Sequence, residues 1–192
     1  MGKFQTMKTV VRMAVWLLML AGGVAGGWWL DQKWFPALYD SLWFHGVSFI
    51  AGLYVLKMVM RVSRNTGQTL AKYGRKGTLP RMETNVLVSR GVYRYMRHPM
   101  HLGLLFFPLA VALLAGSPSF ILVIAPAEML FMLLMIKVVE EPEAMRKFGD
   151  AYRRYREQTP GFCFRKECLK ALLQKVAKED SENSFESTNS QS

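Results

Sequence analysis

The sequence has 192 residues, of which 51% are hydrophobic, and it carries a formal net charge of +11. Apolar and basic residues would compete for the surface of one soluble globule, but here they occupy different stretches of the chain. The stretch from Leu102 to Ile136, for example, contains a single ionisable side chain, Glu128. These features exclude an ordinary cytosolic enzyme and predict a membrane-embedded protein.

The first two long apolar stretches are expected to cross the membrane. A hydrocarbon core about 30 Å thick requires roughly 20 helical residues, and residues 10–30 and 42–60 have that length. The first stretch is not expected to be a cleaved signal peptide, because its apolar run is long and ends without a small-residue cleavage site. It also holds two overlapping pairs of glycines spaced by four residues, which favour close helix packing. These are Gly22 with Gly26 and Gly23 with Gly27.

The last two apolar stretches are predicted to form a tight helical hairpin. Residues 101–115 and 119–139 are apolar, and Gly-Ser-Pro at 116–118 is typical of a turn. The shorter stretch contains Pro108, so a re-entrant or tilted segment is the alternative to a full span. The predicted fold class is an all-α integral membrane bundle of about four transmembrane helices with a cytoplasmic carboxyl-terminal helical segment.

Charge placement supports an even number of spans. Residues 61–100 hold nine Lys and Arg against one acid, Glu83, and the chain also begins with basic residues. By the positive-inside rule, both termini and the 61–100 link are predicted to be cytoplasmic. We expect an integral protein of a bacterial-type inner membrane, with the oligomeric state, monomer or dimer, left open.

The carboxyl-terminal region is predicted to be helical and then disordered. Residues 140–178 are densely charged, and Thr-Pro-Gly at 159–161 should end a helix near Gln158. Leucines at helical spacing then indicate a short amphipathic helix on the anionic leaflet, namely Leu169, Leu172 and Leu173, followed by Val176. We therefore expect one domain over residues 1–178 and a disordered polar tail over 179–192.

The two cysteines are expected to be inert. Cys163 and Cys168 are five residues apart on the predicted cytoplasmic side, where thiols stay reduced. There is no C-x-x-C motif, and the histidines are far from the cysteines in sequence, so no metal site is expected.

A basic and aromatic block lies at the entrance of the third apolar stretch. Arg97 and His98 stand directly before Pro99, and a guanidinium beside the free backbone of a starting helix favours a carboxylate or phosphate ligand. The alternative is that both side chains only reach toward lipid headgroups.

An acidic pair and two tyrosines form the other notable features. Glu140 and Glu141 would oppose the dipole at the end of a helix, unless Pro142 begins a new one. They form either a helix cap or a carboxylate pair for a hydroxyl-rich or cationic ligand. Tyr152 and Tyr155 share one helix face and would either stack on a flat ligand or pack on the bundle.

Together these blocks resemble a known superfamily. Residues 84–162 contain, in order, G-x-Y-x-x-x-R-H-P-x-x-x-G, a predicted helical hairpin, E-E-P, F-G-x-x-Y-x-x-Y and Thr-Pro. This order resembles the isoprenylcysteine carboxyl methyltransferase and phospholipid methyltransferase superfamily of integral membrane enzymes. One position departs from the pattern, because His101 stands where the superfamily usually has Tyr.

The resemblance implies an S-adenosylmethionine-dependent methyltransferase without a Rossmann domain, and the sequence has no strand followed by G-x-G-x-x-G. The implied acceptor is a lipid-like or hydrophobic molecule at the cytoplasmic face, with no nucleic acid partner. An ionised carboxylate acceptor needs no base, whereas an ammonium headgroup must first lose a proton to an imidazole. The implied catalytic residues are Arg97, His98 and His101, and the implied cofactor-binding residues are Tyr93, Arg97, His98, Pro99, Gly103, Glu140, Glu141, Tyr152 and Tyr155.

Two other functions compete with the methyltransferase. One is an NADPH-dependent membrane reductase of the sterol-reductase type, and the other is a non-catalytic membrane protein that binds anionic lipid through residues 61–100. Glu128 is expected to face the bundle interior, where it would line a lipid cavity or hydrogen-bond a neighbouring helix.

Overall fold

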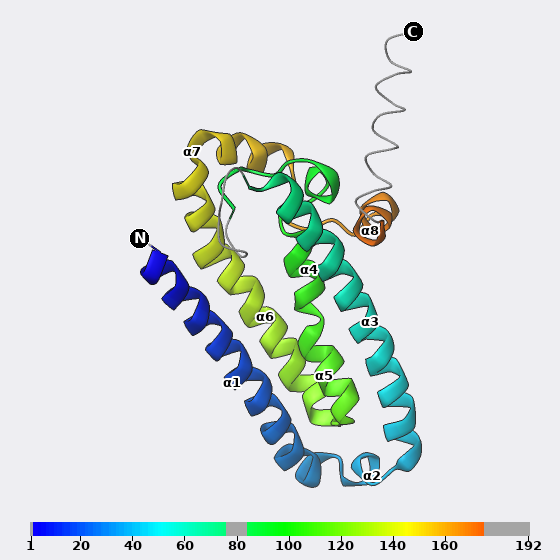
Figure 1. Cartoon of the computed structure of the whole chain (residues 1–192). Helices are drawn as coiled ribbons and strands as arrows, with labels where there is room; N and C mark the ends of the chain where they lie inside the picture. Colours follow the sequence, from blue (N-terminus) through cyan, green and yellow to red (C-terminus); the bar gives the residue numbers. More distant parts are fainter. Residues whose placement is uncertain (1, 76–83, 175–192) are drawn as a thin grey trace. The chain divides into compact units, whose positions relative to one another are not determined.

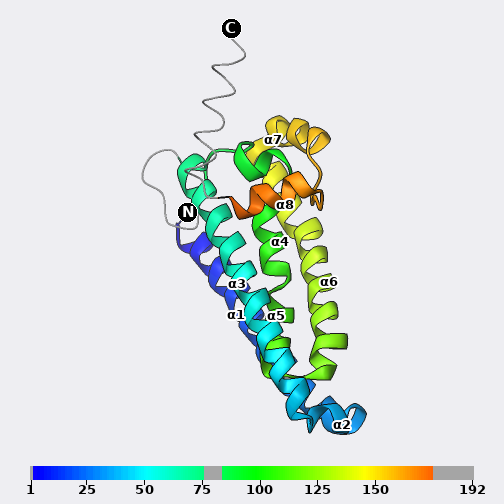
Figure 2. The same cartoon turned by 90° about the vertical axis from the view of Figure 1, so that its right-hand side faces the viewer.

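The computed structural model describes residues 2–75 and 84–174, and the described elements are all helical (Figures 1 and 2). The α-helices are α1 (Gly2–Trp34), α2 (Pro36–Tyr39), α3 (Leu42–Tyr73), α4 (Pro99–Leu105), α5 (Phe107–Ala115), α6 (Ala125–Met135), α7 (Glu141–Gln158) and α8 (Lys166–Leu173). A 3₁₀ turn, η1, covers Gly91–Arg94, and two π-helical turns cover Phe120–Ile124 (η2) and Ile136–Glu140 (η3).

Three of the described helical stretches are long and apolar enough to cross a membrane. They are Val10–Trp34, Leu42–Tyr73 and Phe120–Gln158, whereas Pro99–Ala115 is a shorter apolar stretch. The prediction of an all-helical protein with long apolar helices is confirmed. The count of four spans and the cytoplasmic termini remain predictions, because the stretch over 101–115 is short and broken at Phe106.

The chain divides into two compact units. The first unit combines Met1–Lys57 with Leu105–Leu134, and the second combines Met58–Leu104 with Met135–Ser192. Each unit joins an early and a late part of the chain, so the prediction of one domain over 1–178 is not tested by this division.

In the first unit, α1 packs against α5 and η2 through small residues. A Cβ atom on Gly27 would lie 2.5 Å from Ser117 Oγ, and one on Gly23 would lie 2.6 Å from the ring of Phe120. Nothing lies within 4 Å of a Cβ built on Gly22. The predicted glycine packing is therefore present, on the face of α1 that carries Gly23 and Gly27.

The turn of the predicted hairpin is also in the first unit. Gly116 ends α5 in the left-handed conformation at φ 62°, which glycine adopts without a steric penalty. The fully buried Asp31 of α1 accepts a hydrogen bond of 2.7 Å through Oδ1 from the backbone N–H of Ser119, at the start of the next helix. Asp31 thereby satisfies one of the free donors of that helix end.

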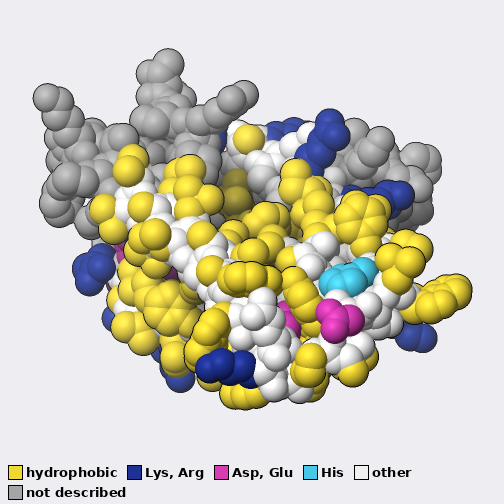
Figure 3. All heavy atoms as spheres, turned by 90° about the horizontal axis from the view of Figure 1, so that it is seen from below, with side chains coloured by type: hydrophobic (Ala, Val, Ile, Leu, Met, Phe, Trp, Pro, Cys, Tyr) yellow, Lys and Arg dark blue, Asp and Glu magenta, His cyan; other side chains and the backbone are white. Residues whose placement is uncertain are grey.

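Large hydrophobic side chains stay exposed on the first unit's helices. Leu18, Leu42 and Trp43 are 71%, 87% and 85% exposed, and hydrophobic side chains gather on the face drawn in Figure 3. Exposed apolar patches of this extent mark a surface that meets lipid or another protein.

In the second unit, α3 continues as a helix into the segment predicted to be a link. The predicted span ended at residue 60, but the helix runs on to Tyr73. Its polar side chains there bond to backbone: Thr66 Oγ1 donates to the carbonyl of Val62 at 2.8 Å, and Asn65 Nδ2 donates to the carbonyl of Leu172 in α8 at 3.1 Å. The part of α3 beyond residue 60 therefore contacts α8, although its charged composition suggested a link between spans.

The first of the carboxyl-terminal helices ends where the sequence predicts. α7 stops at Gln158 before Thr159, and α8 corresponds to the predicted amphipathic helix. Within α7, Gly149 has φ 54°, which splits the helix at a kink. Val176 and the predicted tail over 179–192 lie outside the described residues.

The two cysteines form a disulfide, so the expectation that their thiols stay reduced is wrong. The chain turns between Phe162 and α8 and brings the Cα atoms of Cys163 and Cys168 to 6.0 Å from each other, which lies within the range for a disulfide. A spacing of five residues does not reveal this turn.

Candidate active site

The Arg-His-Pro block is held in place by backbone hydrogen bonds. The N–H of Arg97 donates to the carbonyl of Pro160 at 2.9 Å, and the N–H of His98 donates to the carbonyl of Gly161 at 3.1 Å. Pro99 is buried and begins α4, because its fixed φ and missing N–H suit a first helical turn. The segment that follows α7 thus fixes the side chains that precede α4.

The acidic pair lies where a π turn passes into α7. Pro142 has no N–H to donate to the preceding turn, a condition that disturbs regular α-helical bonding, and the π turn η3 directly precedes α7. Met135, Glu140 and Glu141 all have right-handed helical backbone angles. The helical stretch Phe120–Gln158 is not interrupted there. Pro142 therefore lies within a continuing helix, just after a π turn, and the expected cap at the start of a new helix is not formed.

The acids pair with the basic block. Glu141 Oε1 lies 2.9 Å from Arg97 Nη1 and 3.2 Å from His98 Nε2. Glu140 pairs with His101, whose Nε2 lies 2.9 Å from Oε2. Two predicted blocks separated by about forty residues therefore meet in one network.

A cavity of about 170 Å³ lies beside this network, within the second unit. Tyr155 closes part of its wall, because its hydroxyl donates a hydrogen bond of 2.5 Å to the carbonyl of Tyr93. The cavity is lined by Leu70, Thr84, Val86, Leu87, Val88, Tyr93, Arg97, His98, Glu140, Ala144, Phe148, Tyr152 and Tyr155. The lining combines apolar surface with convergent polar groups, as in small-molecule sites.

Burial sets the charge states of the lining residues. Burial lowers the pKa of His98 below its ordinary value, although the nearby Glu141 carboxylate acts in the opposite direction. Burial also raises the pKa of Tyr93 well above its ordinary range. The neutral forms of both side chains are therefore favoured near pH 7.

Buried polar atoms of the cavity lining that have no hydrogen-bond partner can bind a ligand. Tyr93 Oη and Arg97 Nε are buried and have no hydrogen-bond partner. A buried polar atom without a partner costs about 1–3 kcal/mol, and a polar ligand in the cavity would remove that cost. The residues present therefore fit a ligand that carries hydrogen-bond acceptors.

The structure brings together most of the predicted site residues. Six of them line the cavity, namely Tyr93, Arg97, His98, Glu140, Tyr152 and Tyr155. Glu141 and His101 join the network through their partners. Gly103 does not line the cavity, because it packs close to Val62 and Ser63 of α3.

Sequence reasoning missed one wall of the cavity. Thr84 and Val86–Val88 line it without belonging to any motif. Ala144 and Phe148 also line the cavity and precede the predicted tyrosines in α7. Phe148 belongs to the F-G-x-x-Y-x-x-Y block, and Ala144 lies one helical turn before it, a spacing that would have found it.

The family of the chain follows from a comparison with known protein families. The family model described as phospholipid methyltransferase matches residues 44–151, which is more than half of the sequence. The chain belongs to the phospholipid methyltransferase family. This confirms the resemblance inferred from the R-H-P, E-E-P and tyrosine blocks, which fall within or next to the matched residues.

Curated relatives of this phospholipid methyltransferase family member carry one name, protein-S-isoprenylcysteine O-methyltransferase. The protein from Dictyostelium discoideum is 26% identical over 131 residues, which cover 67% of this chain and 52% of that protein. The protein from Schizosaccharomyces pombe is 31% identical over 86 residues, which cover 42% of this chain and 34% of that protein. The chain thus spans about half the length, or less, of these relatives.

A solved structure is also similar to the chain. It is described as the eukaryotic intramembrane Ras methyltransferase ICMT, isoprenylcysteine carboxyl methyltransferase. The match has 22% sequence identity and a TM-score of 0.48, and it covers 83% of this chain and 53% of that one.

Proposed function

We propose that the protein is a membrane-embedded, S-adenosylmethionine-dependent methyltransferase that acts on a lipid-like or hydrophobic acceptor at the cytoplasmic membrane face. The observation that carries the proposal is the cavity in which Tyr93 and Arg97 keep unpartnered polar atoms beside the Glu140 and Glu141 network. Membership of the phospholipid methyltransferase family supports it.

Arg97 is proposed to bind the cofactor's carboxylate. Its guanidinium has five N–H donors, and Nη1 lies 2.9 Å from Glu141 Oε1. Because the Glu141 carboxylate and the backbone bond to Pro160 fix the residue, the remaining donors are held in position before a ligand arrives. Pre-ordering of this kind reduces the entropy lost on binding.

The acids and His98 complete the proposed cofactor site. S-adenosylmethionine, when bound, would supply an activated methyl group on a sulfonium sulfur. Glu140 and Glu141 can accept hydrogen bonds from ribose hydroxyls or from an amino group. His98 would orient the ligand through a ring nitrogen, and the apolar part of the lining would exclude water from the reacting atoms.

Tyr152 and Tyr155 are proposed as walls of the cofactor site. Their ring centroids lie 6.2 Å apart in an edge-to-face arrangement. That geometry leaves ring surface for a flat group while Tyr155 stays anchored to Tyr93.

The acceptor is proposed to present either a carboxylate or a headgroup amine. The printed names of the relatives point to a carboxylate on a lipidated cysteine, and the family description points to a phospholipid. A carboxylate reacts in its ionised form, whereas an amine must transfer its proton to a base, for which His101 is the proposed group.

The test is thermal unfolding of the detergent-solubilised, chelator-treated protein with S-adenosylmethionine and, separately, with NADPH. A ligand that binds only the folded state raises stability with the logarithm of its concentration. We expect stabilisation by S-adenosylmethionine alone, and its loss in Arg97→Ala. Stabilisation by NADPH alone would favour the reductase, and silence with both ligands would favour a lipid-binding protein.

Two further variants control this test. Arg154→Ala removes an exposed guanidinium from the same region of α7 and should keep the full stabilisation. Arg97→Lys keeps the positive charge but not the planar donor pattern, so it should retain the fold and bind S-adenosylmethionine more weakly. Equal stabilisation of all variants would contradict the role of Arg97.

A further inference from the structure

We propose that His98, His101 and Glu140 form a binding site for a divalent transition metal ion of the zinc class. This inference goes beyond the proposed methyl transfer, because it concerns an ion for which the proposed reaction has no need. It also reverses the expectation from the sequence, in which no metal site was foreseen.

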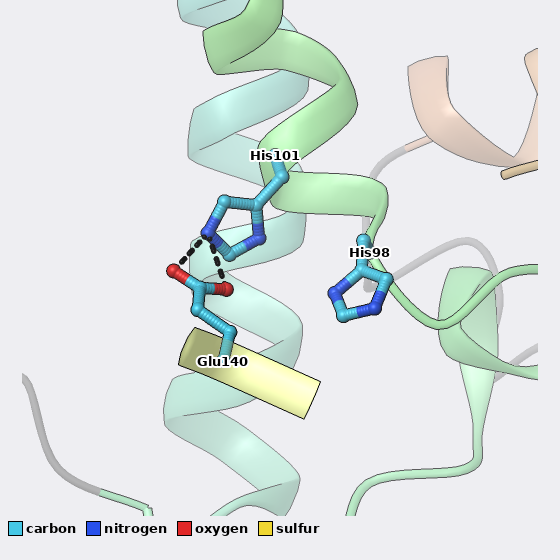
Figure 4. Close-up of side chains that lie close together, drawn as sticks. All are labelled: His98, His101 and Glu140. Atoms are coloured by element: carbon cyan, nitrogen blue, oxygen red, sulfur yellow. Dashed lines mark hydrogen bonds and ion pairs between the residues drawn. The ribbon is translucent and has the colours of Figure 1, made fainter. Parts of the chain in front are cut away.

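The three side chains bring possible ligand atoms close to one another. One atom from each residue can be chosen so that all three lie within 4.8 Å of one another. His101 Nε2 is 2.9 Å from each carboxylate oxygen of Glu140, and Figure 4 shows both oxygens turned toward that nitrogen. Two ligands about 2.1 Å from a tetrahedral metal ion are about 3.4 Å apart, so this pair would have to separate by about half an ångström to hold one.

His98 supplies the third ligand. Its Nε2 is engaged with Glu141 at 3.2 Å, so Nδ1 is the nitrogen left for an ion, which would there replace the contact to the cofactor proposed above. The rings of His98 and His101 are 5.8 Å apart between centroids, and a ring nitrogen of His98 faces the side of His101 and Glu140 in Figure 4.

The surroundings of His98 are those of a metal-binding histidine. Ligating histidines usually hydrogen-bond a carboxylate through their other ring nitrogen, which fixes ring orientation. Glu141 occupies that position, and it is itself paired with Arg97. Because the backbone of His98 is bonded to Gly161 and its ring packs against Phe162, the residue is held in place from two sides.

The donor set selects the class of ion. Two imidazole nitrogens and one carboxylate suit zinc and other first-row transition metals, whereas magnesium and calcium prefer oxygen ligands alone. Three protein ligands leave a coordination position open, as in catalytic rather than structural zinc sites. Because His98 and Glu140 also line the cavity, a bound ion would face its interior.

The experiment uses the full-length chain, purified in detergent with a tag that contains no histidine and freed of metal by a chelator. Titration with Co²⁺ should produce the visible absorption bands of a coordinated ion at one equivalent per chain, and Zn²⁺ should abolish them by displacement. Zn²⁺ should also raise the unfolding temperature in step with the logarithm of its concentration.

Two ligand variants and one control decide the assignment. Replacing a residue that hydrogen-bonds to a metal ligand typically weakens metal affinity about 10- to 100-fold. Replacing a ligand itself, as in His101→Gln and Glu140→Gln, should weaken Co²⁺ binding by at least that factor. Both side chains are partly exposed, at 26% and 31%, and the unfolding temperature of the metal-free variants shows whether they fold. Asp150→Asn, which removes an exposed carboxylate from α7, should bind as the unaltered chain does.

Three results would overturn the site. They are the absence of Co²⁺ bands, affinity that is unchanged in both ligand variants, and stabilisation by Mg²⁺ equal to that by Zn²⁺. The S-adenosylmethionine titration is performed on metal-free protein, so its failure would leave the metal result standing, and the reverse is also true.

Discussion

The two units of the chain are stabilised by different interactions. In the first unit, helices pack closely against one another at glycine residues. For example, a Cβ on Gly52 would lie 2.8 Å from the backbone nitrogen of Leu114. In the second unit, charged side chains meet around the cavity, as in the pair between Arg97 and Glu141. Apolar helices in lipid gain little from hiding apolar surface, so they depend on close contact, whereas a ligand site needs fixed polar groups.

We expect the largest loss of stability from a large side chain on the packed face of α1, and this loss would support the difference between the two units. Gly27→Leu should lower the free energy of unfolding by about 3 kcal/mol, because overpacking forces neighbouring atoms to move, here Ser117 and Phe120. Gly22→Leu, on the open face, is the matched control and should change little. Equilibrium unfolding in mixed micelles measures both, and equal losses would show that α1 is not packed through Gly27.

The buried carboxylate of Asp31 tests whether a polar contact also stabilises the first unit. Asp31→Ala should cost about 2 kcal/mol, because the buried N–H of Ser119 would lose its acceptor. Asp31→Asn keeps an oxygen that can accept this bond and should lose much less. The same unfolding measurement applies, and similar losses in the two variants would indicate that the charge matters rather than the hydrogen bond.

The smallest effect is expected from one hydroxyl in the second unit. Tyr155→Phe should lower the free energy of unfolding by about 1 kcal/mol, the net value of a typical hydrogen bond, since it removes the bond to the Tyr93 carbonyl. Tyr95→Phe is the control, because Tyr95 is 39% exposed. A loss in the control as large as in Tyr155→Phe would contradict the proposed anchoring of the cavity wall.

The sequence was a good guide to the site because its motifs are local. The R-H-P block, the acidic pair and the tyrosines were each visible from residue type and spacing. Their meeting was foreseen only through the resemblance to a superfamily. The pairing of Arg97 and His98 with the carbonyls of Pro160 and Gly161 carries no sequence signal, because any residue offers the same backbone atoms.

Two of the misses come from contact between segments distant in sequence, and the third comes from a local turn. The helix that continues to Tyr73 was read as a link, because its charges conceal a side packed against a cluster that includes Leu172. The disulfide between Cys163 and Cys168 depends on a turn that the spacing does not determine. The sequence analysis assigned no role to Asp31, whose hydrogen-bond partner Ser119 is 88 residues away.

The kink at Gly149 has a consequence for how the cavity can evolve. Ala144, Phe148, Tyr152 and Tyr155 would extend over about 16 Å along a straight helix, yet all four line one cavity because the helix bends between the second and the third (Figure 1). Nothing lies within 4 Å of a Cβ at this glycine, so the restriction comes from its φ of 54° alone. Relatives that accept other ligands could therefore reshape the cavity by replacing this residue, without any new contact, since a changed backbone angle would redirect both tyrosines at once.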